Sequence, residues 1–223
     1  MPHPDGMPAL MPAPSALALL PAWAHGWTLA RGTPPPVLTD EQVLKIDVGR
    51  PGHKVRYIVL KQDLAVTRQL ARDLNEPGTW LKVCAPKEAI APLLPPRWTL
   101  DPPRYFMQTR LSLQADLRAP DGYTWRVTED GAALAASIVS KEGHPAATGR
   151  LVLFDRYAIF DQIQTDPSHR RKGLGKYLMR ALGHRALSAG IKHGLLVATE
   201  DGQQLYRSIG WQLISPYTSA GIV

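Results

Sequence analysis

The sequence of 223 residues has a single cysteine, no long apolar run and fewer acidic than basic residues. Cys84 alone makes no intrachain disulfide or cysteine-based zinc cage, and this cysteine usage favours a reducing cytoplasmic location. No run approaches the roughly 18 apolar residues of a membrane helix, so we expect no membrane partner. With 44% apolar and 20% charged residues, the composition is that of an ordinary globular protein and excludes wholesale disorder.

One apolar segment, residues 16–24 (ALALLPAWA), ends in the Ala-Trp-Ala pattern that a signal peptidase accepts. However, no Lys or Arg precedes Arg31, and Asp5 lies in the region that should be positively charged. We therefore predict that it is not a secretory signal peptide.

The basic excess, 26 Lys and Arg against 19 Asp and Glu, raises the question of an anionic partner. Part of the excess is clustered, because residues 166–193 contain seven basic residues and one acid. Aromatic residues are not interleaved with these charges, as a stacking platform for nucleic acid requires. We expect a compact polyphosphate ligand and no nucleic acid.

The first 119 residues divide into an arm and a small α+β module. Residues 1–36 hold nine of the 21 prolines, which predicts a poorly ordered arm with at most a short strand at 26–30. Residues 37–119 are predicted to form a module, which by itself indicates no chemistry. Its expected elements are a hairpin at 43–48 and 54–60, helices at 61–75 and 87–94, and strands at 80–83 and 105–113.

A turn at Pro120-Asp121-Gly122 is the predicted boundary to the second domain, residues 120–223. Its period-two pattern predicts an antiparallel meander of four strands at 123–128, 132–140, 148–154 and 157–165. The pattern then predicts a helix at 173–189, a buried strand at 194–199, a short helix at 201–209 and a strand at 211–215. We find no internal repeat in the sequence.

The loop before the long helix, Arg-Arg-Lys-Gly-Leu-Gly-Lys at 170–176, carries the strongest chemical signal. Backbone N–H groups of a glycine-rich turn and a helix N-terminus bind anions, and the flanking cations add to this. The spacing fits neither the dinucleotide GxGxxG pattern nor the P-loop, so NAD and ATP lose support. The alternative is a helix start with a solvated basic face.

These residues resemble the GCN5-related N-acetyltransferase (GNAT) superfamily. Its acetyl-CoA motif, [Arg/Gln]-x-x-Gly-x-[Gly/Ala], is matched by Arg170, Gly173 and Gly175. Residues 163–167 are similar to the family's bulged strand, and its C-terminal signature is matched by Leu205-Tyr206 and Gly210-Trp211. The resemblance covers residues 120–223. It implies an α/β (α+β) N-acyltransferase fold, a mixed, mostly antiparallel sheet with a splayed strand pair, here preceded by an N-terminal α+β half.

The resemblance also implies acetyl-CoA as co-substrate. The backbone of the loop would hold its pyrophosphate, through Arg170, Arg171, Lys172, Gly173, Leu174, Gly175 and Lys176. The strand residues Ile163, Gln164 and Thr165 would pair with the pantetheine arm as an added strand, and a backbone N–H near the bulge would stabilise the oxyanion. Thr199 stands where many members have a cofactor-contacting Asn, which is a departure from the family.

Two residues are candidate catalytic groups. Tyr206 matches the family's general acid, since a phenol can protonate a departing thiolate; the alternative is that it only packs beneath the sheet. Asp161 lies where many members carry a Glu and is the candidate general base. By two-residue periodicity it shares a face with Ile163 and Thr165. A solvated or substrate-orienting Asp161 is an equal alternative.

The two helices that usually shape the acceptor site after the first strand are absent between Tyr123 and Phe154. Either the helices at 61–75 and 87–94 supply them, or the first module is a separate, degenerate GNAT-like half.

Other candidates have structural explanations. His184 and His193 lack metal-ligand spacing, and we expect no metal. His144 and Glu142 fit a hairpin turn, Cys84 fits a buried strand rather than an acyl-enzyme, and the six Trp are core residues by default.

We therefore predict an N-acetyltransferase that transfers the acetyl group of acetyl-CoA to a primary amine by direct attack in a ternary complex. The predicted acceptor is a small molecule: an amino acid, a polyamine or an amine-bearing antibiotic. The alternatives are a protein or peptide N-acetyltransferase and a non-catalytic acyl-CoA sensor. The oligomeric state stays open, a homodimer included.

Overall fold

The structure, a computed structural model, describes residues 15–39, 42–60, 63–113 and 117–223. Its strands form one 12-stranded sheet in the order β1-β2-β3-β4-β12-β6-β11-β10-β9-β8-β7, with β5 paired to β12 beside this path. The elements are α1 (Ala16–Arg31), β1 (Val37–Leu38), β2 (Val43–Arg50), β3 (His53–Val59), α2 (Leu64–Asp73), β4 (Thr79–Val83), α3 (Lys87–Ile90), β5 (Thr99–Leu100), β6 (Arg104–Arg110), β7 (Tyr123–Asp130), β8 (Ala133–Ser140), β9 (Pro145–Phe154), β10 (Tyr157–Thr165), α4 (Leu174–Ser188), β11 (His193–Ala198), α5 (Glu200–Arg207) and β12 (Gln212–Gly221), with 3-10 turns at Ala91–Leu93 and Pro167–His169.

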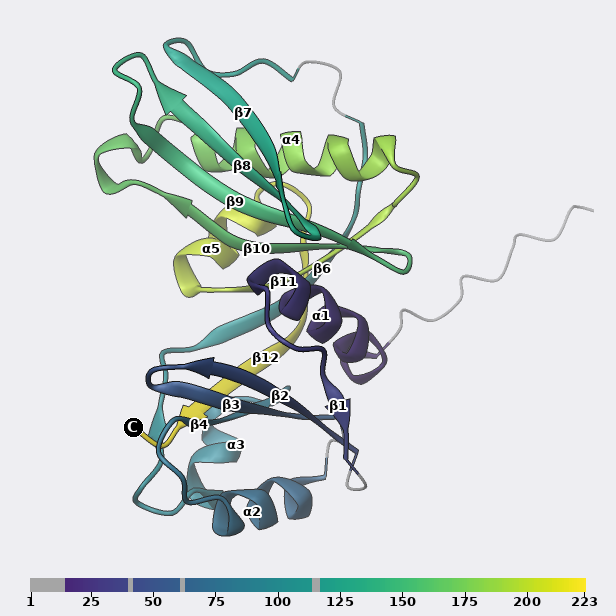
Figure 1. Ribbon diagram of the computed structural model, residues 1–223, viewed down its shortest axis with the longest axis vertical. Coiled ribbons are helices and arrows are strands. Elements are labelled where there is room, and N and C mark those ends of the chain that lie inside the picture. The colour runs from purple at the N-terminus through teal and green to yellow at the C-terminus, as the bar shows by residue number, and fades with distance from the viewer. Residues whose placement is uncertain (1–14, 40–41, 61–62, 114–116) are drawn as a thin grey trace, which may run out of the picture.

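Figure 1 shows two halves, which we call the upper half (β7 to β11 with α4 and α5) and the lower half (β1 to β4 with α2 and α3). In the upper half, β7 to β10 pair antiparallel in sequence order, which confirms the predicted meander. β10 and β11 are parallel, are connected through α4, and pair only through residues 157–159 with 193–195. Beyond this point they separate, so the sheet carries the predicted splayed strand pair.

The lower half repeats the same order of elements. β2 and β3 form the predicted hairpin, and α2 connects β3 to the parallel strand β4. In the upper half, β9, β10, α4 and β11 follow the same plan. A short helix and a last strand complete each set, α3 with β6 and α5 with β12. The topology therefore contains a repeat that the sequence does not show.

The last strand of each set crosses into the other half. β6 pairs with β11 of the upper half, and β12 pairs with β6 through residues 212–217 and with β4 through residues 218–221. Figure 1 shows β12 running from the upper to the lower half. Sheet hydrogen bonds thus cross the boundary predicted at residue 120. The strand predicted at 211–215 is longer than expected, because it continues through Pro216 next to a register shift between Leu213 and Ser215.

The prediction of a poorly ordered arm over residues 1–36 is wrong for the part that the structure describes, and so is the short strand at 26–30. Residues 16–31 form α1, while residues 1–14 lie outside the described residues. The hydroxyl of Ser15 accepts from Ala18 N at the start, and Gly32 ends the helix with φ 62°. The prediction failed because proline was counted as a helix breaker, whereas tertiary packing keeps Pro21 inside α1.

α1 packs between the two halves. Its core partners include Ile46 and Ile58 from the lower half and Val152 and Ile159 from the upper half. Arginines from both halves bind its last carbonyls: Arg150 of β9 donates to Ala30 O (2.8 Å), and Arg50 of β2 donates to Arg31 O (3.1 Å). α1 is largely apolar, and most of its residues are buried, as expected for such a helix, while Ala18 and Leu29 are exposed. Among the described residues, no helix is long and apolar enough to cross a membrane.

Gly26 allows α1 to approach β10 closely. A Cβ atom added to it would lie 2.4 Å from Ile159 Cγ1. We expect Gly26→Val to lower the free energy of unfolding in urea by roughly 2 kcal/mol or more, because of overpacking. Leu29→Val, at a 37% exposed position of the same helix, introduces the same residue and is expected to change stability by less than about 0.5 kcal/mol. Equal effects of the two substitutions would contradict the docking of α1 on β10.

Candidate functional site

Two cavities meet where β10 and β11 separate. The first, of about 990 Å³, lies between the end of β10, the 166–171 loop and α5, and we call it the loop cavity. The second, of about 420 Å³, lies between α1, β3, β4 and the strands of the upper half, and we call it the inner cavity. Four residues line both: Ile163, Gln164, Thr199 and Tyr206. A ligand in one cavity therefore reaches a ligand in the other at this junction.

The predicted site residues fall on the two cavities as follows. Ile163, Gln164, Thr165, Arg170, Arg171, Thr199 and Tyr206 line the loop cavity, and Asp161 lines the inner cavity. Lys172 and Lys176 are exposed at the start of α4. Leu174 is buried in the core, so only its backbone is available to a ligand. Thr199 caps α5, since its hydroxyl accepts from Gly202 N (3.1 Å).

The N-terminus of α4 is open to an anion. The first N–H groups of a helix lack partners within the helix, and a capping side chain often takes one of them. Gly173 is the cap residue, with φ 76°, and makes no side-chain cap hydrogen bond. A Cβ added to Gly173 would have no atom within 4 Å, so the space beside this backbone is free. With Arg170 and Arg171 on the cavity wall, the residues present fit the pyrophosphate of coenzyme A.

The corresponding helix of the lower half differs. α2 follows β3 as α4 follows β10, but its cap residue is Asp63, whose carboxylate accepts from Ala65 N (2.8 Å). A carboxylate at this position takes one of the N–H groups and repels a second anion. The two halves of the repeat therefore differ at this helix N-terminus: it carries no capping side chain in α4 and is capped by a carboxylate in α2.

Gly175 has a packing role. A Cβ there would lie 2.9 Å from Leu205 Cδ2 of α5 and 3.4 Å from Thr165 Oγ1 of β10. The second glycine of the motif therefore lets α4 lie close to α5 and β10, which form other walls of the loop cavity.

β10 contains the predicted bulge. Its register against β9 shifts between Asp161 and Gln164, and Gln162 has φ 54°, a strained value for a residue with a side chain. Gly149 lies opposite, where a Cβ would be 2.5 Å from Ile163 Cδ1. A bulge inserts one residue, so simple alternation fails here. Asp161 contacts α1, whereas Ile163 packs with the α4 core, and the prediction that they share a face is wrong.

Tyr206 stands at the junction of the cavities. It is 6% exposed, and its ring centroid lies 6.0 Å from that of Trp211. Burial raises the pKa of Tyr206 above its ordinary value, and the negative charge of Asp161 raises it further. The phenol is therefore protonated at neutral pH, which is the form a general acid needs.

Asp161 is paired with Arg31 of α1. Arg31 Nε donates to Asp161 Oδ2 (2.7 Å) and Arg31 Nη2 donates to Oδ1 (3.1 Å). This two-pronged contact fixes the carboxylate at the wall of the inner cavity. Sequence analysis missed Arg31 because it treated residues 1–36 as an arm.

The inner cavity also has a cationic and aromatic lining that sequence analysis did not find. His53 and Arg56 come from β3, Trp80 and Lys82 from β4, and Trp23 and Trp27 from α1. Burial, then the charges of Arg56, Lys82, Arg31 and Arg50, lower the pKa of His53 to about 3, so the imidazole is neutral. Neither α2 nor α3, the helices expected at 61–75 and 87–94, contributes a lining residue to the inner cavity, whereas α1, β3 and β4 do.

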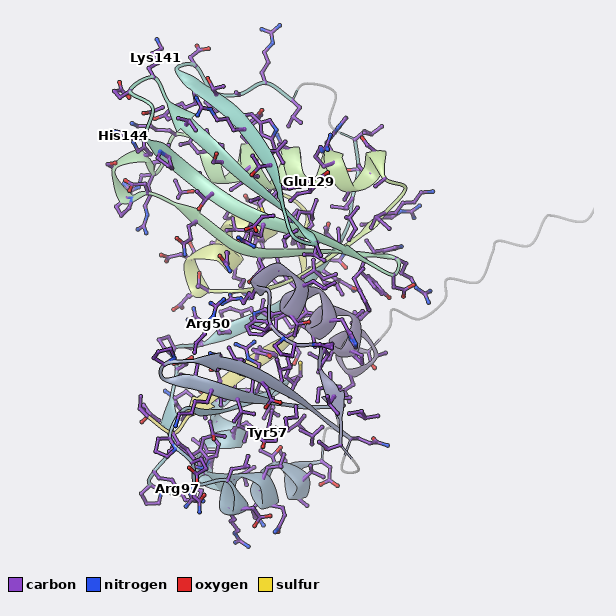
Figure 2. The ribbon with its side chains drawn as sticks, in the orientation of Figure 1. Arg50, Tyr57, Arg97, Glu129, Lys141 and His144 are labelled. Carbon is purple, nitrogen blue, oxygen red and sulfur yellow. The ribbon has the colours of Figure 1, made fainter. Side chains whose placement is uncertain are left out.

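The remaining candidates stay outside the site. Cys84 is buried, and burial raises the pKa of its thiol to about 12, which disfavours the nucleophilic thiolate. His144 lies with Lys141 at the outer tip of the upper half, away from α1 (Figure 2). Over the part of the chain that the structure describes, no group of three His, Cys, Asp or Glu residues is arranged to hold a metal ion.

A comparison with known proteins relates this fold to the GNAT superfamily. A model of the acetyltransferase (GNAT) domain matches residues 121–213. The fold resembles a GCN5-related N-acetyltransferase from Kribbella flavida, with a TM-score of 0.64, 16% identity and coverage of 94% of this chain and 96% of the other. It also resembles one from Sphaerobacter thermophilus, with a TM-score of 0.58, 12% identity and 92% coverage of each chain.

At these identities the solved structures show the fold alone, but they extend the likeness across the lower half as well as the upper half. The family model covers the meander, the glycine-rich loop, α4, β11 and α5. Members of the GCN5-related N-acetyltransferase superfamily use acetyl-CoA as co-substrate. Residues 121–213 of this chain match the acetyltransferase (GNAT) domain of that superfamily, which is the domain of an acyltransferase enzyme.

Proposed function

We propose that the protein transfers the acetyl group of acetyl-CoA to a primary amine of a small molecule, by direct attack in a ternary complex. The observation that carries this proposal is the junction of two cavities at Tyr206, one lined by Arg170 and Arg171 of the loop before α4 and the other lined by residues of α1. A thioester entering through the loop cavity and an amine in the inner cavity meet there. The inner cavity, of about 420 Å³, has the size of a small-molecule site.

The loop cavity suits an extended, amide-bearing chain. β10 pairs with β11 only through residues 157–159, so the β11-facing edge of residues 163–165 is available for hydrogen bonds to a pantetheine arm. The proposed pyrophosphate contacts are the backbone N–H groups at 170–176 and the α4 N-terminus. In this pose the thioester lies next to the bulge, and a backbone N–H freed there stabilises the oxyanion.

The proton steps are assigned to two side chains. The amine nitrogen attacks the thioester carbonyl carbon, and the C–S bond breaks as Tyr206 donates its proton to the leaving sulfur. The second proton of the attacking nitrogen then passes to the Tyr206 phenolate, which gives the neutral amide and restores the phenol. Asp161, through a water molecule, accepts the proton that the substrate ammonium must lose before attack. The net reaction yields the N-acetyl amide and CoA as free thiol. A reducing cytoplasm, the proposed location, keeps Cys84 as a thiol.

The test of the proposed function is a thiol-release assay with acetyl-CoA and a panel of amino acids, polyamines, amine-bearing antibiotics and peptides. Release that depends on one small amine supports the proposal. Release with peptides alone supports the protein or peptide acetyltransferase, and CoA binding without any release supports the sensor.

For the cofactor site, we expect CoA to raise the melting temperature of the wild type by mass action, equivalent to about 2.7 kcal/mol at a hundredfold excess over Kd. Gly173→Val should abolish the shift, because it strains a residue at φ 76° and fills the space beside the backbone. Gly131→Val, at a glycine with φ 61° in the β7–β8 turn, applies the same strain away from the loop and should leave the shift intact. A wild type without a CoA shift would refute the assignment.

For the general acid, we expect Tyr206→Phe to lower kcat by about tenfold or more while leaving the Kd of acetyl-CoA nearly unchanged, because the hydroxyl acts when the thiolate departs. Tyr57→Phe, in the lower half (Figure 2), is the matched control and should keep wild-type turnover. Wild-type turnover in Tyr206→Phe would contradict the general-acid role and would show that Tyr206 only packs in the core.

For the general base, we expect Asp161→Asn to lower kcat/KM most at low pH, where the amine is protonated, and to regain activity at high pH, where the amine deprotonates in solution. Asp155→Asn, in the exposed turn before β10, should leave the pH profile unchanged. A uniform loss at all pH values would assign Asp161 to orientation of the substrate, together with Arg31.

A further inference from the structure

The inner cavity contains buried cations without carboxylate partners. Arg56 is 8% exposed and Lys82 is 5% exposed. Over the described parts of the chain, no carboxylate oxygen lies within 4.0 Å of a nitrogen of either side chain, or of Arg104. Buried charges in proteins are normally paired, because an unpaired one carries a large desolvation penalty. Two buried cations at a cavity wall, neither with a carboxylate partner, therefore indicate a binding site for an anion.

The existing contacts of these cations leave donors free. Arg56 Nε donates to His53 Nε2 (3.4 Å), and its other side-chain N–H groups have no acceptor among the described residues. Lys82 Nζ donates to Ser219, whose hydroxyl donates onward to Asp101 Oδ2 (2.7 Å). Burial lowers the pKa of Arg56 to about 10 and that of Lys82 well below its ordinary value, because the buried site disfavours the charged form of each side chain. An anion in the cavity would offset this penalty.

A third group faces the same space. Tyr217, on the wall of the inner cavity, is 4% exposed, and its hydroxyl is buried without a hydrogen-bond partner in the part of the chain that the structure describes. A buried hydroxyl without a partner is destabilising, because it has lost its hydrogen bonds to water. The Tyr217 hydroxyl can therefore donate a hydrogen bond to an anion that Arg56 also binds. Arg56 lies close enough for its positive charge to lower the pKa of Tyr217, although burial is the larger effect and raises it.

The cavity is poorly suited to a polycation. Its four cations (Arg31, Arg56, Lys82 and Arg104) outnumber its two carboxylates (Asp101 and Asp161). The indole faces that could bind an ammonium are already occupied. The guanidinium carbon of Arg56 lies 3.8 Å from the Trp27 ring centroid, and Lys82 Nζ lies 4.2 Å from that of Trp80. A polyamine would meet like charges on this side.

We infer that Arg56, Lys82 and Tyr217 bind an anionic group of the acceptor, and that the acceptor is an amino acid or a related amine that carries a carboxylate. The forked N–H groups of Arg56 match the two oxygens of a carboxylate. The amine would then point to the junction of the two cavities, which Tyr206 lines, with Asp161 on the wall of the inner cavity. This inference rests on the proposed function, since it names the substrate class of the same site.

The binding test uses probes that cannot react. N-acetyl derivatives of the common amino acids are screened by thermal shift and then by calorimetry, with spermidine as the cationic probe. We expect at least one N-acetyl amino acid, and not spermidine, to bind the wild type. Arg56→Met and Lys82→Met should each weaken that binding by roughly 30-fold or more. Lys54→Met, an exposed residue of the same strand as Arg56, removes equal charge and should bind as the wild type does.

A stability measurement separates a binding role from a structural one. Without ligand, Arg56→Met and Lys82→Met should be at least as stable to urea as the wild type, because each removes an unpaired buried cation. A clear loss of stability, together with unchanged probe binding, would assign both residues to the scaffold and overturn the inference. Binding of spermidine but of no N-acetyl amino acid would overturn it as well.

Kinetics distinguish this inference from the proposed function. With an acceptor found by thiol release, Arg56→Met should raise the KM of that amine and leave the KM of acetyl-CoA unchanged, and the carboxamide of the same amine should be a poor substrate. Turnover of spermidine that Arg56→Met does not affect would overturn the inference and keep the transferase. Probe binding that Arg56→Met abolishes, without thiol release from any amine, would refute the transferase and keep the anion site.

Discussion

The early separation of β10 from β11 is the constraint on which the rest of the structure depends. Two parallel strands that pair only through residues 157–159 with 193–195 leave open backbone and apolar surface beyond that point. On one face α1 fills the opening, with Trp23 packed edge-on against Phe106 and Tyr217. On the other side the loop cavity remains. Because buried backbone groups need partners, this open edge is stable only if water or an extended ligand pairs with it.

Charged groups make the two cavities at this opening chemically different. The loop cavity is lined by two arginines of the loop that leads into the uncapped N-terminus of α4, while the inner cavity has buried cations and a fixed carboxylate. Arg31 and Asp161 are paired, so their charges offset each other, whereas Arg56 and Lys82 are not paired with a carboxylate. Evolution seldom retains uncompensated buried charge for stability. Such charge is expected where a ligand supplies the opposite charge. The unpaired cations Arg56 and Lys82 therefore account both for a cost in stability without ligand and for the proposed preference for an anionic acceptor.

Local signals predicted the upper half well, and interactions distant in sequence account for what was missed. The meander and the loop at 170–176 follow from alternation, turns and glycine placement within short segments, whereas the bulge was expected only from the resemblance to the GNAT superfamily. Helix α1 was missed because its stabilisation comes from residues more than 100 positions away, such as Ile159 and Arg150. The inner cavity was missed for the same reason, since Arg56 and Lys82 sit in strands whose patterns indicate only a sheet. The shared face of Asp161 and Ile163 was predicted wrongly because a bulge breaks a period of two.

The repeated topology explains how one chain divides the two binding tasks. Each half places a helix N-terminus after a strand of a parallel pair, but Gly173 leaves that terminus open and Asp63 closes the other. The lower half, having no anion site at its helix, presents β3 and β4 to the opening instead, with Arg56 and Lys82. Strands β6 and β12 cross between the halves and pair with each other, so the halves cannot move apart without breaking sheet hydrogen bonds. A rigid junction of this kind holds two substrates at a fixed approach, which is what direct transfer between them requires.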